Sequence, residues 1–103
     1  PIKLLINRKS YSASSYCAAM IKELPNAELI GQITGGGAGG NLSYQLSNGW
    51  IVAVSVSDFY DPQYQSIEEG VRPDIYVNNT QEELSKGVDN MLNTAIDRIR
   101  NQE

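Results

Sequence analysis

Serine is the residue type with the clearest catalytic potential, because several serines gather in one short segment, Ser10-Tyr11-Ser12-Ala13-Ser14-Ser15. This segment follows a short apolar run and opens a stretch with helical spacing. A helix N-terminus offers free backbone N–H groups and the positive end of the helix dipole, which both favour negative charge. Nucleophilic serines are often held there, with the N–H of the next residue ready to bind an oxyanion. The simpler alternative is a hydroxyl that only caps the helix, and this segment alone favours the cap.

The chain offers no obvious base for such a serine. It contains no histidine, so neither a Ser-His-Asp nor a Cys-His arrangement can be completed, and we expect no metal site and no cofactor. A serine hydroxyl without a neighbouring base is a poor nucleophile at neutral pH. Lys9, in the turn beside Ser12, is interpreted as a solvated charge, and the other lysines as surface residues: Lys3, Lys22 and Lys86. We therefore expect little or no hydrolysis by this chain alone.

A glycine-rich segment follows, Thr34-Gly35-Gly36-Gly37-Ala38-Gly39-Gly40-Asn41, which cannot form regular structure. A Walker loop would require Gly-Lys followed by Ser or Thr, and a dinucleotide-binding loop would open a helix. This segment contains no lysine and leads into a strand pattern, so nucleotide binding is disfavoured. Two other interpretations stay open: a mobile connection, or a loop whose backbone N–H groups line a substrate cleft.

The other chemically active side chains have simpler interpretations. Glu68 and Glu69 precede the segment Gly70-Val71-Arg72-Pro73-Asp74, and taken alone they indicate a solvated turn. Cys17 is the single cysteine, which excludes an internal disulfide, and its place on an apolar helix face predicts a buried thiol. Several tyrosines are predicted to be half-buried packing residues: Tyr60, Tyr64 and Tyr76.

The elements that must position the serines form a βαβ pattern. The nearly continuous apolar run 2–6 predicts a strand covered on both faces. From Ser12, apolar residues recur with helical spacing until Pro25 ends the helix, and they predict one buried face: Ala13, Tyr16, Cys17, Met20, Ile21 and Leu24. A second strand is expected over 27–33. Strand, helix and strand in about thirty residues indicate a parallel pair of strands.

The rest of the chain predicts a hairpin, a short strand and a helix. Apolar and polar residues alternate over 42–46, Asn48-Gly49 is typical of a two-residue hairpin turn, and residues 50–56 are expected to continue as a strand. Residues 73–77 predict a short strand. A capping box at Thr80-Gln81-Glu82-Glu83 opens one amphipathic helix that continues to the end of the chain. Gly87 weakens this helix by about 1 kcal/mol, which we expect packing of its apolar face to offset.

Composition narrows the class of protein. The chain has 103 residues, of which 41% are hydrophobic and 19% charged, so it can build a core within a single small domain. Its net charge of −4 and the lack of a basic stripe argue against nucleic acid as a partner. No apolar run approaches the roughly 20 residues that a membrane-spanning helix requires.

The order of these motifs resembles the C-terminal-processing (tail-specific) serine peptidase family, whose relatives include the tricorn protease core and interphotoreceptor retinoid-binding protein. The shared order is a strand, a serine-rich turn into a helix, a glycine-rich loop after the next strand, and a Gly-x-x-Pro-Asp element before a final helix. The implied fold is α/β, the C-terminal portion of a crotonase-like (ClpP-like) domain with a βαβ unit, a β-hairpin and a C-terminal helix. The resemblance covers nearly the whole chain, and it implies that residues 1–103 are only the last part of the family's catalytic domain.

The resemblance also implies roles for particular residues. Ser12 aligns with the nucleophile of the family's Ser-Ala-Ser-Ala-Ser-Glu-type motif, and the N–H of Ala13 would contribute to the oxyanion hole. Classical members place a catalytic lysine where this chain has Gly37, so the Ser-Lys dyad is absent. The tricorn-like and retinoid-binding-like branch uses instead a histidine from an earlier part of the domain, assisted by a glutamate. Glu68 matches that glutamate best, with Glu69 second, and the loop 35–37 would contact substrate through Gly35, Gly36 and Gly37.

From this resemblance we expect the nucleophile-bearing end of a serine endopeptidase domain that lacks its N-terminal part. Pro1 leads directly into a strand, which fits a fragment. Peptides or proteins would be the substrates, many family members work outside the cytoplasm, and a truncated sheet predicts self-association. Two alternatives stay open: a non-catalytic module of the same fold that binds a ligand or peptide, and a structural domain without a site.

Overall fold

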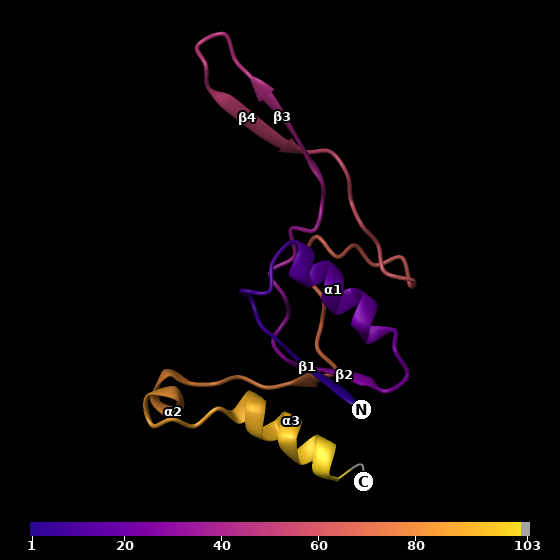
Figure 1. Ribbon diagram of the computed structural model, residues 1–103, viewed down its shortest axis with the longest axis vertical. Coiled ribbons are helices and arrows are strands. Elements are labelled where there is room, and N and C mark those ends of the chain that lie inside the picture. Colours follow the sequence, from indigo (N-terminus) through magenta and orange to yellow (C-terminus); the bar gives the residue numbers. More distant parts are fainter. Residues whose placement is uncertain (102–103) are drawn as a thin grey trace.

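Residues 1–101, which the computed structural model describes, form a three-layer arrangement around a small parallel sheet. The sheet has the strand order β1-β2-β5, with α1 on one face and α3 on the other (Figure 1). The elements, in chain order, are β1 (Ile2–Ile6), α1 (Ala13–Lys22), β2 (Ala27–Gly31), β3 (Asn41–Gln45), β4 (Ile51–Ser55), β5 (Ile75–Tyr76), α2 (Gln81–Ser85) and α3 (Asn90–Arg100). The predicted α/β class and βαβ unit are confirmed.

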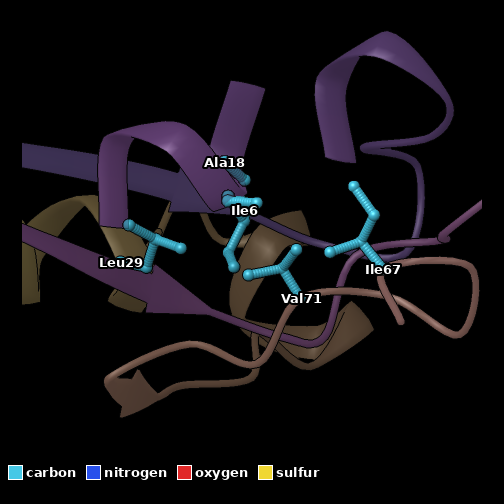
Figure 2. Close-up of a cluster of buried hydrophobic side chains, with 6 residues drawn as sticks. Ile6, Ala18, Leu29, Ile67 and Val71 are labelled. Carbon is cyan, nitrogen blue, oxygen red and sulfur yellow. The ribbon is translucent and has the colours of Figure 1, made fainter. Parts of the chain in front are cut away.

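The core lies between α1, the sheet and the segment 67–71. β1 and β2 pair in parallel from Ile2 with Ala27 to Ile6 with Gly31, and β5 joins the other edge of β2. Figure 2 shows how side chains of this cluster converge from β1, α1, β2 and the segment 67–71. Its buried members are Ile6, Ala18, Ala19, Leu29, Ile67 and Val71. The segment 67–71 therefore belongs to the same packed unit as the strand and the helix that flank the serine turn.

The helix α1 packs with its small side chains against the sheet. Its buried residues are Ser15, Ala18 and Ala19, whereas Cys17 and Tyr16 are exposed. The predicted buried face was therefore wrong except at Ile21, which is partly buried against the core, and the prediction of a buried thiol at Cys17 was wrong. Small side chains let the helix axis approach the strands closely. Large apolar residues are left on the outer surface, namely Tyr16 and Met20 of α1 and Leu24 just after its end.

A charged cluster joins β1, β2 and α3. The Lys3 ammonium group lies 2.6 Å from a Glu28 carboxylate oxygen, and these residues are register partners in the parallel pair. Arg98 of α3 donates to the same carboxylate, and its Nε lies 3.1 Å from Oε2. Only 2% of the Lys3 side chain is exposed, so its interpretation as a surface residue was wrong. The cluster ties the C-terminal helix to the sheet.

The C-terminal region forms two helices where one was predicted. The capping box at Thr80 and Glu83 is confirmed, but α2 ends after one turn and buries no residue. Gly87 follows with φ 75°, a left-handed conformation that interrupts the helix. The helix α3 then starts with its own cap, because the Asp89 carboxylate accepts a hydrogen bond from the Leu92 N–H at 3.0 Å.

The hairpin of β3 and β4 extends away from the rest of the molecule (Figure 1). The Leu46 N–H donates to the Trp50 carbonyl at 2.7 Å, so three residues, 47–49, form the loop instead of the predicted two. The register brings apolar side chains of both strands to one face: Leu42, Tyr44, Leu46, Trp50, Val52 and Val54. All of them are exposed. The Cα radius of gyration is 17.1 Å, against about 13 Å for a compact domain of this length.

Candidate functional site

The serine-rich turn joins the end of β1 to the start of α1. The Ser10 N–H donates to the Asn7 carbonyl at 2.9 Å, and the Asn7 side chain accepts from the Lys9 N–H at 2.8 Å, which together close a tight turn. Tyr11 then pairs with Gly36 as a parallel bridge. The glycine loop therefore lies beside the residue that precedes Ser12, at the start of α1.

Ser12 has a strained backbone. Its φ of 59° and ψ of −121° lie outside the regions that non-glycine residues favour, and such conformations cost on the order of 1–3 kcal/mol. Its hydroxyl forms no capping hydrogen bond, and the residue is exposed. The interpretation of this hydroxyl as a helix cap was therefore wrong. A sharp strand-to-helix turn with an exposed, strained serine is the arrangement of a nucleophile elbow.

Backbone hydrogen bonds hold this conformation from two sides. The Ser12 N–H donates to the Gly36 carbonyl at 2.7 Å. The Ser12 carbonyl accepts from the N–H groups of Ser15 at 2.9 Å and Tyr16 at 3.2 Å. Within residues 1–101, the Ser12 hydroxyl and the Ala13 N–H have no hydrogen-bond partner. The structure thus leaves free the two groups that an acyl transfer would use at this turn.

A buried hydroxyl, which the sequence analysis missed, connects the turn to the glycine loop. Ser15 is 0% exposed, and its Oγ lies 3.0 Å from the Ser10 carbonyl, 3.0 Å from Thr34 Oγ1 and 3.1 Å from the Gly36 carbonyl. The same Oγ accepts from the Gly36 N–H at 3.1 Å. Thr34 Oγ1 in turn accepts from the Val71 N–H at 2.8 Å. The sequence did contain a signal for the burial of Ser15, because Ser15, Ala18 and Ala19 are spaced so that they form one face of small residues on the helix.

The glycine loop is anchored by its own backbone. The N–H groups of Gly35, Gly36 and Gly37 donate to the Ser10 carbonyl, Ser15 Oγ and the Glu68 carbonyl at 2.8, 3.1 and 3.0 Å. These three N–H groups are therefore not available to line a substrate cleft or to hold a phosphate, and that interpretation was wrong for them. Substrate contact through other atoms of Gly35–Gly37 stays a prediction. A Cβ at Gly36 would overlap the Glu68 carbonyl group, which explains why glycine is required there.

The two candidate glutamates have different surroundings. The Glu68 carboxylate accepts from the Gly39 N–H at 3.2 Å, and its carbonyl holds Gly37, so the residue lies directly against the glycine loop. Glu69 instead lines a separate cavity of about 260 Å³ together with Lys22 and Arg72. Lys9 is exposed in the turn. Of the predicted site residues, the structure places Ser12 and Glu68 against the loop 35–39, with Ala13 next to Ser12 in the chain, and the role of each stays a prediction.

Residues 1–101 contain no group of three or more His, Cys, Asp or Glu side chains arranged to hold a metal ion. No helix in the described part of the chain has both the length and the apolar character needed to cross a membrane.

Comparison with known proteins gives consistent results. The model of peptidase family S41 matches residues 1–77. A carboxyl-terminal-processing protease from Synechocystis sp. is 32% identical over 75 residues, which are 72% of this chain and 18% of that protein. The crystal structure of a Parabacteroides merdae protein superposes with a TM-score of 0.85 at 38% identity and covers 93% of this chain and 30% of that one.

The tricorn protease crystal structure shares the fold, with a TM-score of 0.76 at 22% identity over 98% of this chain and 10% of its own. The chain therefore spans less than a third of the length of each of these relatives.

Proposed function

The chain belongs to peptidase family S41, and we propose that it supplies the nucleophile-bearing part of a serine peptidase site. The Ser12 hydroxyl oxygen attacks the carbonyl carbon of a peptide bond, and the Ala13 N–H donates to the oxyanion that forms. The intermediate expels the amine and leaves an acyl group on Ser12, which water then hydrolyses. The backbone of Ser12 carries this proposal, because it is held at positive φ while the hydroxyl is exposed and unbonded within residues 1–101.

The reaction requires a group that accepts the Ser12 proton and returns it to the leaving amine. The chain contains no histidine, and Lys9, the lysine nearest in sequence, is exposed. In the proposal this base is a histidine from an N-terminal part of the same catalytic domain, outside residues 1–103, and Glu68 orients it. The position of Glu68 against the glycine loop supports this role, because its carboxylate accepts a single hydrogen bond, from Gly39, within residues 1–101 and so keeps acceptor capacity.

Two consequences follow for the chain by itself. Without the base, residues 1–103 alone hydrolyse peptides little or not at all. The apolar face of the hairpin and the open edges of β1, β3 and β4 also favour association with a second copy of the chain. Peptides or proteins are the substrates of the whole enzyme.

A fluorophosphonate probe tests the nucleophile directly, because it forms a covalent bond only with an activated serine. We expect labelling of the longest natural chain that contains these residues, loss of labelling in Ser12→Ala, and retention in Ser14→Ala, which removes an exposed hydroxyl two residues away. Residues 1–103 alone should react far more slowly. Labelling that persists in Ser12→Ala refutes the assignment. A folded natural chain that is never labelled supports the second candidate, a peptide-binding module, which the lack of a base in this chain favours.

A further inference from the structure

A second cavity, of about 460 Å³, lies along the outer surface of α1. Its other wall is the segment 60–67, which runs past α1 after the hairpin. The cavity combines aromatic rings with carboxylates, and no lysine or arginine lines it. We call it the tyrosine cavity, and the residues that define it are Tyr16, Met20, Glu23, Tyr60, Asp61 and Tyr64.

Hydrogen bonds and ring packing hold the walls of the tyrosine cavity in place. The ring of Tyr16 packs edge-to-face on Phe59, with centroids 5.3 Å apart, and so links α1 to the facing segment. The Asp61 carboxylate accepts from the N–H groups of Gln63 at 3.0 Å and Gln65 at 2.7 Å, which closes the turn that carries Tyr64. The opening of the cavity is therefore formed by a fixed turn.

The tyrosines are not the half-buried packing residues that the sequence predicted. Tyr64 has a φ of 59°, unusual for an aromatic residue, and 86% of it is exposed. Tyr60, and Tyr76 outside this cavity, are also exposed. The Tyr64 ring is exposed to water, so contacts within the chain do not offset the strain of its backbone. A ligand that contacts this ring would explain both its exposure and its strained backbone.

The lining of the tyrosine cavity fits a Lys or Arg side chain, which carries a positive charge at the end of a chain of methylene groups. Faces of aromatic rings attract Lys and Arg head groups, and the attraction increases where carboxylates lie beside the rings. The Glu23 carboxylate has no hydrogen bond or ion pair within residues 1–101, although it also lines the neighbouring cavity that Lys22 and Arg72 line. Met20, Tyr16 and Ile67 provide apolar surface for the methylene groups of the stem. The net charge of −4 favours the approach of a basic peptide.

The cavity begins one helical turn from the candidate nucleophile. The Tyr16 N–H donates to the Ser12 carbonyl at 3.2 Å, and Tyr16 and Met20 continue the line of Ser12 along α1. At 1.5 Å per residue these side chains start about 6 and 12 Å from Ser12. An extended peptide rises about 3.3 Å per residue and covers that distance in two to four residues.

We propose that the tyrosine cavity binds the Lys or Arg side chain of a peptide substrate, two to four residues from the bond that Ser12 attacks. The distance from the cleaved bond rests on the proposed function. The binding of the cationic side chain does not, and the two parts can be tested separately.

Binding is measured on the chain itself by two-dimensional ¹⁵N–¹H NMR, in the Ser12→Ala background so that no turnover occurs. The probes are acetyl-Ala-Ala-Arg-Ala-Ala-amide and the same peptide with citrulline, which has the shape of arginine without its charge. We expect shifts at Tyr16, Glu23 and Tyr64, and roughly two- to fivefold tighter binding of the arginine peptide for each carboxylate that it meets.

Variants identify the source of this preference. Glu23→Gln should weaken binding of the arginine peptide roughly two- to fivefold and leave the citrulline peptide unchanged. Asp97→Asn removes the same charge from the exposed surface of α3 and should change neither. Equal affinity for the two peptides, or equal effects of the two variants, overturns the proposal.

The position of the peptide is read from a nitroxide label on an arginine peptide lengthened by one residue, so that the label lies three residues from the arginine. It should broaden the amide resonances at the start of α1, and broadening confined to other regions overturns the assigned distance from Ser12. Failure of fluorophosphonate labelling at Ser12 would refute the nucleophile and leave these binding results unaffected.

Discussion

The buried hydroxyl of Ser15 allows a quantitative test of how the candidate site is held together. It accepts from the Gly36 N–H and lies within hydrogen-bond distance of Thr34 Oγ1 and the carbonyls of Ser10 and Gly36. Ser15→Ala removes the oxygen with almost no change in volume. The Gly36 N–H then loses the acceptor that it has in the folded chain, whereas Thr34 Oγ1 keeps its bond from the Val71 N–H.

The loss of folding stability that we expect in Ser15→Ala is the difference between two opposing free-energy contributions. Leaving a buried N–H without an acceptor costs about 1–3 kcal/mol. Alanine is favoured over serine in a helix by about 0.5 kcal/mol, so the net loss of stability should be roughly 0.5–2.5 kcal/mol. Ser14→Ala is the matched control, because Ser14 lies on the same helical turn and is exposed. The difference between the two variants removes the helix-propensity term and leaves about 1–3 kcal/mol.

Urea unfolding at one fixed protein concentration measures both variants. Ser15→Ala should unfold at clearly lower urea, with an unchanged slope, whereas Ser14→Ala should match the parent or exceed it slightly. Thr34→Val combined with Ser15→Ala completes a double-mutant cycle, and we expect the two effects to be less than additive because the side chains share one hydrogen bond. If Ser15→Ala and Ser14→Ala agree within about 0.5 kcal/mol, Ser15 does not anchor the glycine loop.

Three further predictions concern the sheet, the turn and the hairpin. The pKa of Glu28 is lowered from 4.5 to about 2, chiefly by the hydrogen bond from Arg98. Its contribution to stability is therefore complete above pH 4.5 and lost as the pH falls toward 2, and the urea midpoints of the parent and Glu28→Gln should converge over that range. Ser12→Gly should be more stable than Ser12→Ala, because only glycine relaxes at positive φ, and equal midpoints would contradict the strain. Light scattering should show self-association that Val54→Lys on the apolar hairpin face reduces and Ser43→Lys on the opposite face does not, and a monomeric parent chain at micromolar concentration would refute it.

Local patterns predicted the elements better than they predicted the packing of those elements. The βαβ unit, the hairpin and the capping box depend on short spacings, and all three are present. The prediction of the buried face of α1 was largely wrong, because periodicity identifies the largest apolar side chains, whereas the fully buried residues of α1 are small ones, such as Ala18. The break at Gly87 was missed because packing was expected to offset its cost, yet α2 buries no residue.

In the candidate site, too, the sequence predicted the features that depend on neighbouring residues, but not those that depend on contacts between distant segments. The turn at Ser12 is local, and the motif order predicted it. The groups that hold it are distant in sequence, because Ser15 meets Thr34 and Gly36, which lie 19 and 21 residues away. No spacing rule connects them, since their contact depends on how closely α1 approaches the glycine loop. A hydroxyl that is buried cannot be told from one that is exposed until that approach is known.

Gly36 is the residue on which the strain at Ser12 and the position of Glu68 both depend. Its carbonyl accepts from the Ser12 N–H, its N–H donates to Ser15, and it has no room for a side chain beside the Glu68 carbonyl. The hydrogen bonds to Gly36 are well placed to offset a cost of about 1–3 kcal/mol at Ser12. The turn and the glutamate therefore cannot move independently. A displacement of the glycine loop would therefore be transmitted to both the serine and the carboxylate, because Ser12 is bonded to Gly36 and Glu68 to Gly37 and Gly39.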